Sequence, residues 1–215
     1  YQRRVRGIIM VFDLTQILQQ TPPFTLTLIV SAIILSILTT MQVISPFSVT
    51  LEWFGISQGQ LYRLFTGFVY FGPISLQNIL FIMQNIKQVS SLEKESFANK
   101  KREFVVFLVF VWSSVLLVSR FIKINYAATP FFSVLSYVYT KKHPDQIMAL
   151  MGIIMLPASY LPFVNIILQY LMKASIFVPF FGMFVGHIWW YIEDVLPGLI
   201  GKDLIKWICR GADKK

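Results

Sequence analysis

Six long apolar tracts constrain the fold of this 215-residue chain more than any other feature of its sequence. A helix needs roughly 20 apolar residues to cross the hydrocarbon core of a bilayer. The chain is 56% hydrophobic and only 13% charged, too few charges to cover a soluble surface of its size. We therefore predict an all-α polytopic membrane protein with six transmembrane helices, in a single domain covering residues 1–215. The expected spans cover residues 24–44, 62–89, 104–119, 126–140, 147–172 and 176–196.

The fourth tract is too short to cross an ordinary bilayer. At 1.5 Å per residue, a helix over residues 126–140 reaches about 22 Å, against a hydrocarbon core of roughly 30 Å. We expect this span to lie centrally in the bundle or in locally thinned lipid.

Lys and Arg are distributed unequally between the two sides that six spans define. Only Arg63, Arg120, Lys123 and Lys173 of the 19 basic residues fall on the side opposite both termini. Cytosolic loops are rich in Lys and Arg, so we predict cytosolic termini: a short N-terminal segment, residues 1–21, and a basic tail, residues 198–215. The net charge of +9 is scattered over several loops, which indicates contact with anionic lipid headgroups rather than nucleic acid.

Amide side chains recur at helical spacing along the second tract. They are Gln77, Asn78, Gln84, Asn85 and Gln88. Amides in hydrocarbon need hydrogen-bond partners. Two interpretations stay open: the amides hold the bundle together, or they line a polar groove that opens toward one leaflet. Asn165 and Gln169 of the fifth tract are further candidates for such a groove.

Groups that could carry out covalent chemistry are scarce. Neither His143 nor His187 has a second His, Cys or acid at metal-ligand spacing, so we predict no metal and no cofactor. His187 could serve as the base for a serine nucleophile, or it could be a polar side chain that the bundle satisfies. Glu193 and Asp194 are adjacent and cannot face each other on a helix, so we expect them to anchor at the interface.

The connections between the tracts are short. Residues 45–61 include Trp53 and Phe54, a composition suited to the bilayer interface. Residues 92–103 form a mixed-charge connector that we expect to be solvated. Gly182 and Gly186 in the sixth tract form a Gly-x-x-x-Gly step, which allows two helices to approach closely.

Several motifs together resemble those of the Derlin family. Residues 60–66 read Gln-Leu-Tyr-Arg-Leu-Phe-Thr and include the aromatic-Arg pair Tyr62-Arg63. Residues 68–73 follow as Phe-Val-Tyr-Phe-Gly-Pro, and residues 185–188 read Val-Gly-His-Ile. Other matches, such as Thr-Pro-Pro at residues 21–23, extend the resemblance over nearly the whole chain.

This resemblance implies a rhomboid-like bundle of six helices with a lateral opening between the second and fifth spans. Active rhomboids place a serine nucleophile at the start of the fourth span and a catalytic histidine in the sixth. Those positions read Ala128 and Pro179 here, and the oxyanion-side positions fall near Gln77 and Phe81. Neither alanine nor proline can act as nucleophile or base, so the resemblance implies a pseudoprotease.

The family role implied is a non-catalytic factor of endoplasmic-reticulum-associated degradation. Such a factor recognises misfolded proteins of the endoplasmic reticulum and helps to move them to the cytosol for ubiquitin-proteasome degradation. The implied partners are a membrane ubiquitin ligase complex with its adaptors, and further copies in a homo- or hetero-oligomer. The tail at residues 201–215 lacks a Phe-Gly-type box, so we expect an AAA ATPase to be engaged indirectly.

Two alternatives from other classes stay open. An active intramembrane serine protease would need a nucleophile elsewhere, such as Ser133. A small-solute channel or transporter would predict paired intramembrane charges or inverted repeats, and neither pattern is visible in the sequence.

Overall fold

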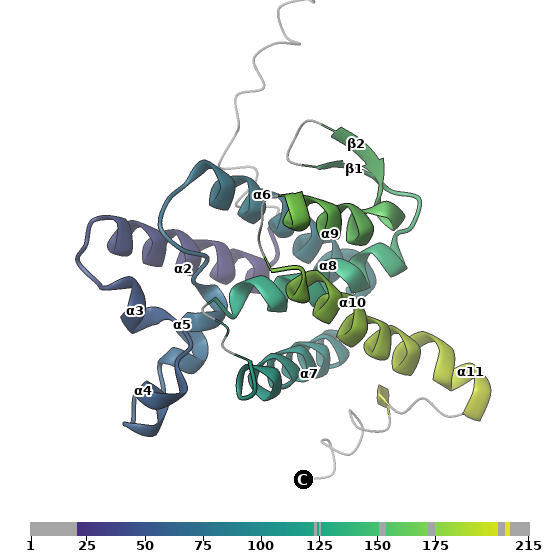
Figure 1. Ribbon diagram of the computed structural model, residues 1–215. Coiled ribbons are helices and arrows are strands. Elements are labelled where there is room, and N and C mark those ends of the chain that lie inside the picture. The colour runs from purple at the N-terminus through teal and green to yellow at the C-terminus, as the bar shows by residue number, and fades with distance from the viewer. Residues whose placement is uncertain are drawn as a thin grey trace, which may run out of the picture.

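The computed structural model describes residues 21–122, 124, 126–150, 154–171, 175–201 and 205–206. These residues form a helical bundle with one small hairpin (Figure 1). The longer helices are α2 (Pro23–Thr40), α6 (Leu76–Ser91), α7 (Lys101–Ser119), α8 (Ala128–Lys142), α9 (Leu161–Leu171) and α10 (Phe177–Trp190). Short elements connect them: α3 (Pro46–Val49), α4 (Trp53–Ser57), α5 (Arg63–Val69), the π-helical turns η2 (Leu92–Ser96) and η4 (Tyr191–Val195), the 3-10 turn η3 (Ala158–Tyr160), and α11 (Leu196–Ile200).

Contacts between distant segments define one end of the bundle. The carboxylate of Glu93, just after α6, accepts hydrogen bonds from the backbone N–H groups of Phe24 (3.1 Å) and Thr25 (3.0 Å) at the start of α2. The ring of His143, just after α8, lies 3.1 Å from the hydroxyl of Ser96 in η2. The start of α2 and the ends of α6 and α8 therefore meet at one end, which we call the inner end.

Helix directions alternate along the chain as six crossings require. The ammonium of Lys142, at the end of α8, lies 2.7 Å from the carboxylate of Glu193 in η4, so α10 also finishes at the inner end. The indole N–H of Trp53 in α4 donates to the hydroxyl of Ser119 at the end of α7 over 3.1 Å. We call this opposite end, which also holds α3 and α4, the outer end.

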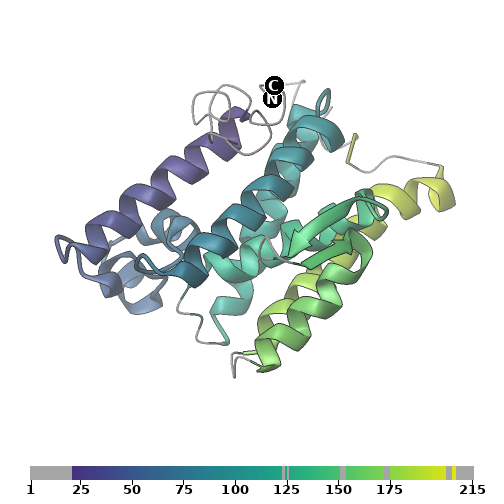
Figure 2. The ribbon, with the colours of Figure 1, turned by 90° about the horizontal axis from the view of Figure 1, so that it is seen from above.

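Helix α8 is the centre of the bundle, with α6, α7, α9 and α10 packed around it (Figures 1 and 2). It has 15 residues, as short as the sequence predicts, and 11 of them are buried. An ideal helix of this length reaches about 22 Å, less than the roughly 30 Å hydrocarbon core.

The predicted second span, residues 62–89, is wrong as one continuous helix. It divides into α5 and α6, joined by the turn at residues 70–75. Gly72 adopts φ +114°, a conformation that favours glycine, and Pro73 cannot donate a backbone hydrogen bond. The amide of Asn78 then donates to the carbonyl of Pro73 over 2.9 Å, which holds the turn against the first residues of α6.

The predicted fifth span, residues 147–172, is also wrong as one helix. Its first part forms an antiparallel hairpin in which β1 (Ile147–Leu150) pairs with β2 (Ile154–Pro157). Pro157 favours an extended residue before it and cannot continue a helix, and α9 starts only at Leu161 with Pro162 in its first turn.

Two of the described helices, α2 and α7, are long and apolar enough to cross a membrane by length and composition. The six-span count thus remains a prediction, although the alternating helix directions are consistent with it. The connector at residues 92–103 is not simply solvated. Leu92 and Phe97 are fully buried, and the Phe97 ring stacks on Phe107 of α7 with 5.7 Å between centroids.

Candidate functional site

The amides of α6 do not form one uniform surface. Asn78, at the outer end, holds the turn before the helix, while Asn85 donates to the carbonyl of Phe81 in its own helix over 2.7 Å. Gln84 is half-buried. Gln77 lies in the first turn of α6, but its side chain is outside the described part of the structure.

Gln88, at the inner end of α6, is the most deeply buried of these amides, with only 1% of its surface exposed. Its amide N–H₂ faces the thioether sulfur of Met148 in β1 at 3.9 Å, a weak acceptor. Its side-chain carbonyl has no hydrogen-bond partner among the described residues. Burying an unpaired carbonyl costs about 1–3 kcal/mol, so this amide lowers the stability of the bundle at this point.

The amides of α9 are separated from those of α6. Asn165 and Gln169 are both half-buried, and α9 packs against α8 and α10, whereas α6 packs against α2 and α8. Within the described part of the chain, no hydrogen bond joins the two sets of amides. The two helices thus flank α8 instead of closing tightly on each other.

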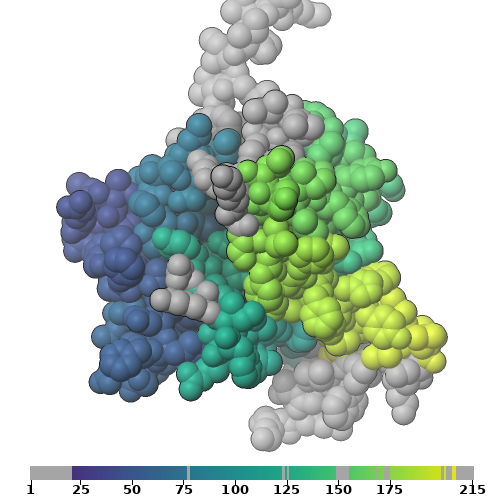
Figure 3. Space-filling model, viewed as in Figure 1, coloured from purple at the N-terminus to yellow at the C-terminus, as the bar shows by residue number. Residues whose placement is uncertain are grey.

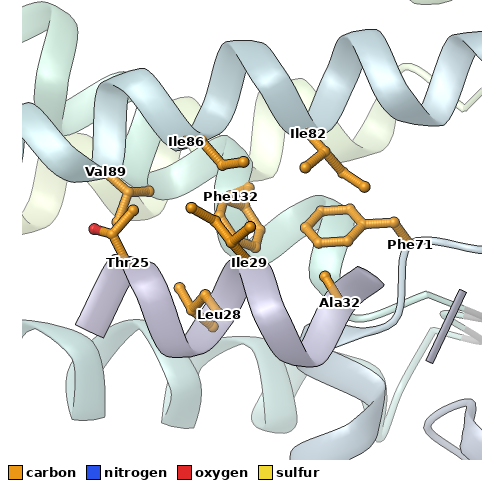
Figure 4. A pocket seen from close by; sticks show the side chains of 9 residues that line it. All are labelled: Thr25, Leu28, Ile29, Ala32, Phe71, Ile82, Ile86, Val89 and Phe132. Atoms are coloured by element: carbon orange, nitrogen blue, oxygen red, sulfur yellow. The ribbon is translucent and has the colours of Figure 1, made fainter. Parts of the chain in front are cut away.

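The space between α2, α6 and α8 is apolar (Figure 4). It contains a cavity of about 10 Å³, around the size needed for one water molecule. Its lining is Thr25, Leu28, Ile29, Ala32, Phe71, Ile82, Ile86, Val89 and Phe132. A water here would find few polar partners, so a polar route does not run on the α2 side of α6.

Aromatic rings fill the region beside the nucleophile position of the rhomboid pattern. Ala128 is fully buried at the start of α8. One turn further on, the ring of Phe132 lies 4.9 Å from Phe71, which in turn lies 5.8 Å from Phe81 of α6. Phe81 is one of the two positions that the resemblance assigns to the oxyanion side. Aromatic rings of α8, of the turn before α6 and of α6 itself thus pack together in this region.

Helices α8 and α10 run parallel and in close contact through two glycines. A Cβ at Gly182 would meet the backbone of Ser133 at 2.8 Å, and one at Gly186 would meet the ring of Tyr137 at 2.6 Å. The partners advance by four residues on both helices, so Ala128 and Pro179 lie at the same, outer end of the pair. Pro179 is buried as well.

The two histidines have different partners, a tyrosine for His187 and a serine for His143. His187 is exposed, and its Nδ1 lies 3.1 Å from the Tyr137 hydroxyl. The Nε2 of His143 approaches both the Ser96 hydroxyl (3.1 Å) and the Glu95 carboxylate (3.7 Å). A triad needs the acid and the serine on different ring nitrogens, so this cluster lacks triad geometry. Among the described residues, no group of three His, Cys, Asp or Glu could hold a metal ion.

Arg63 organises the outer end. Only 7% of its surface is exposed, and its guanidinium donates to the carbonyls of Phe47 (2.5 Å) and Thr50 (3.2 Å) and to the side chain of Gln60 (2.6 Å). It also lies 5.9 Å from the ring of Tyr62. One side chain thus connects α3, the segment after α4 and the start of α5.

Sequence reasoning missed the polar residues that position the outer turn. Ser36 of α2 donates to the carbonyl of Gly72 over 3.1 Å, and the hydroxyl of Thr40 accepts from the backbone N–H of Ile74 over 3.0 Å. Ser36 lies on the buried side of α2 with Ala32 and Thr39, whereas Thr40 is exposed at the last residue of the helix. The sequence signal that could have identified these residues is the spacing of small and hydroxyl side chains within an otherwise aliphatic helix.

The chain matches the family model described as the Der1-like family over residues 21–207. This chain belongs to the Der1-like family. An uncharacterized derlin-like protein of Schizosaccharomyces pombe is 26% identical over 84% of this chain and 96% of its own length. Derlin-2.1 of Zea mays is 26% identical over 87% of this chain and 80% of its own length, and Derlin-1 of Oryza sativa is 26% identical over 80% and 72%.

These matches confirm the resemblance to Derlins that the motifs indicated. Family membership and the apolar helices α2 and α7 together identify a helical membrane protein. The described helices give the family's motifs a physical reason: the Tyr62-Arg63 pair anchors the outer loop, the Phe-Gly-Pro turn joins α5 to α6, and Gly186 lies against α8.

Proposed function

We propose that this chain is a non-catalytic rhomboid-like factor that recognises misfolded proteins of the endoplasmic reticulum and helps to move them to the cytosol for ubiquitin-proteasome degradation. The observation that carries the proposal is the Der1-like match over residues 21–207. The buried Ala128 and Pro179 support a role without hydrolysis, because neither side chain can form or assist an acyl-enzyme.

The proposed path for polypeptide lies between α6 and α9, the second and fifth spans. Gln84 and Gln88 of α6 supply amides on one side, and Asn165 and Gln169 of α9 are the candidates on the other. Each unpaired backbone group costs several kcal/mol in hydrocarbon, so amides and water along the path lower the barrier for a polar chain. The 15-residue α8 and 11-residue α9 support locally thinned lipid, which shortens the path.

We further propose a membrane topology and a set of partners for this protein. One rhomboid-like domain over residues 1–215 crosses the membrane of the endoplasmic reticulum six times, with both termini in the cytosol. It works with a membrane ubiquitin ligase complex and its adaptors, singly or as an oligomer, and engages an AAA ATPase indirectly. The basic residues of the inner end, among them Lys94, Lys100 and Lys101, support this orientation.

Site-specific photocrosslinking tests the path. A benzoylphenylalanine at Gln84 should crosslink to a misfolded substrate in microsomes, whereas one at Met83, exposed on the same helix, should crosslink mainly to lipid. Replacing Gln77, Gln84 and Gln88 together by Leu should slow substrate degradation, with Met83→Leu as the matched control. Unchanged degradation by a folded triple variant would rule out the path along α6.

A further inference from the structure

The β1–β2 hairpin carries backbone hydrogen-bonding groups that β1 and β2 do not use for each other. In an antiparallel pair, residues that exchange both hydrogen bonds alternate with residues whose N–H and C=O point outward. The bond from the Ala158 N–H to the Gln146 carbonyl (2.8 Å) sets this alternation. Ile147 and Ala149 of β1 therefore direct their N–H and C=O groups away from β2.

The two edges of the hairpin are not equivalent. On the β2 edge, Pro157 has no N–H, and proline is a residue that protects strand edges from pairing. On the β1 edge, Ile147 and Ala149 each have a backbone N–H that can donate and a C=O that can accept. Within the described residues, no backbone group from another segment bonds to them. The β1 edge is thus open to a further strand.

The two faces of the hairpin have different surroundings. The side chain of Met148 faces α6, where the buried carbonyl of Gln88 is unpaired. On the opposite face of the hairpin, Ile147 and Met155 are each 69% exposed. Figures 1 and 3 show the hairpin at the margin of the molecule, above α9. The apolar side chains of Ile147 and Met155 are therefore uncovered beside the outward backbone groups of β1.

We propose that the β1 edge binds an extended segment of misfolded polypeptide as a third strand, at the inner end of the path between α6 and α9. This inference rests on the proposed function. Strand addition uses main-chain hydrogen bonds, which every unfolded segment can offer whatever its side chains. The edge would pair the backbone of a substrate where it leaves the amides of α6.

Peptide binding to the full chain in phosphatidylcholine nanodiscs tests the pairing. The probe is a fluorescein-labelled peptide of alternating Val and Thr, about ten residues long, the upper range of ordinary strands. A second peptide is N-methylated at alternate residues and so lacks the donors of one edge. We expect the methylated peptide to bind at least about fivefold more weakly, since each lost backbone hydrogen bond reduces affinity severalfold.

Three variants assign the binding to the β1 edge. Ile147→Pro removes one outward N–H and should weaken binding about fivefold, whereas Ile147→Thr keeps the N–H and should bind within about twofold. Met155→Pro places the same residue on the opposite edge and should bind like the wild type. Unchanged thermal unfolding of each variant checks the fold.

The outcomes separate this inference from the proposed function. Equal binding of both peptides, equal effects of Ile147→Pro and Ile147→Thr, or no binding at all would overturn strand addition at β1. In each case, continued crosslinking of substrate to Gln84 would leave the proposed path in place. If the probe at position 84 of the otherwise unchanged chain gave no crosslink to substrate, the path itself would be overturned.

Discussion

Two glycines set how closely α10 lies against α8. A Cβ at Gly182 would meet backbone atoms of Ser133 at 2.8 Å, and backbone cannot move aside as a side chain can. Gly182→Ala should therefore lower the free energy of unfolding by about 2–3 kcal/mol, and Gly186→Ala, which meets the Tyr137 ring, by about 1–2 kcal/mol. Thermal unfolding in mild detergent measures both. Gly198→Ala is the control, because its Cβ would meet open space, and an equal loss in all three variants would contradict the packing argument.

Arg63 acts through the shape of its guanidinium as well as its charge. A lysine keeps the charge but cannot reach Phe47, Thr50 and Gln60 together, because it lacks the planar fork. Arg63→Lys should increase amide hydrogen exchange in residues 46–57 by about tenfold, since each bond to a charged group contributes about 1.5–3 kcal/mol. Arg102→Lys is the matched control, because Arg102 lies at the start of α7 and so at the inner end, away from residues 46–57. Equal protection in the two variants would contradict the role of Arg63.

The sequence indicated which side chains are polar, but not which groups they bond to. The amides of α6 were visible as a pattern, but a pattern does not show that Asn78 turns back to Pro73 or that Asn85 bonds to its own helix. Those bonds depend on where the preceding turn places its carbonyls. The partner of His187 could not be predicted either, because Tyr137 lies 50 residues away in the chain.

At the scale of elements, a buried ion pair ties the inner ends of α8 and α10. The side chains of Lys142 and Glu193 are 14% and 7% exposed and lie 2.7 Å apart. Lys142→Met should cost about 3 kcal/mol of stability, because it leaves the buried carboxylate without its counter-charge. Adding Glu193→Gln should recover most of that loss, because it removes the unpaired charge. The side-chain carbonyl of the glutamine can still accept from the indole N–H of Trp189, which donates to Glu193 over 2.7 Å in the wild type.

Thermal unfolding of the two single variants and the double variant measures this coupling. Lys100→Met is the control, because Lys100 is 49% exposed beside Glu103 and such a pair contributes about 0.5 kcal/mol or less. A double variant as unstable as the sum of the single changes would show that the two charges do not interact.

Elements were predicted well where one apolar tract forms one helix, and less well where a tract breaks. The bounds of α2, α7 and α8 lie within a few residues of the prediction. The second and fifth tracts break at Pro73 and Pro157, yet their hydropathy stays high on both sides. Hydropathy reports the tendency to leave water, which a buried turn or hairpin shares with a spanning helix.

The whole molecule has one end rich in cations and ion pairs and one end built from apolar loops around Arg63. Labelling of single cysteines in microsomes, in a Cys209→Ser background, tests whether these ends lie on opposite sides of the membrane. Asn99→Cys and Gly198→Cys should react with an impermeant maleimide in intact vesicles, because both residues are exposed and belong to the inner end. Gln58→Cys, exposed in the outer loop, should react only after detergent opens the vesicles. Labelling of Gln58→Cys in intact vesicles would contradict the six-crossing topology, and with it a path that leads from the outer to the inner end.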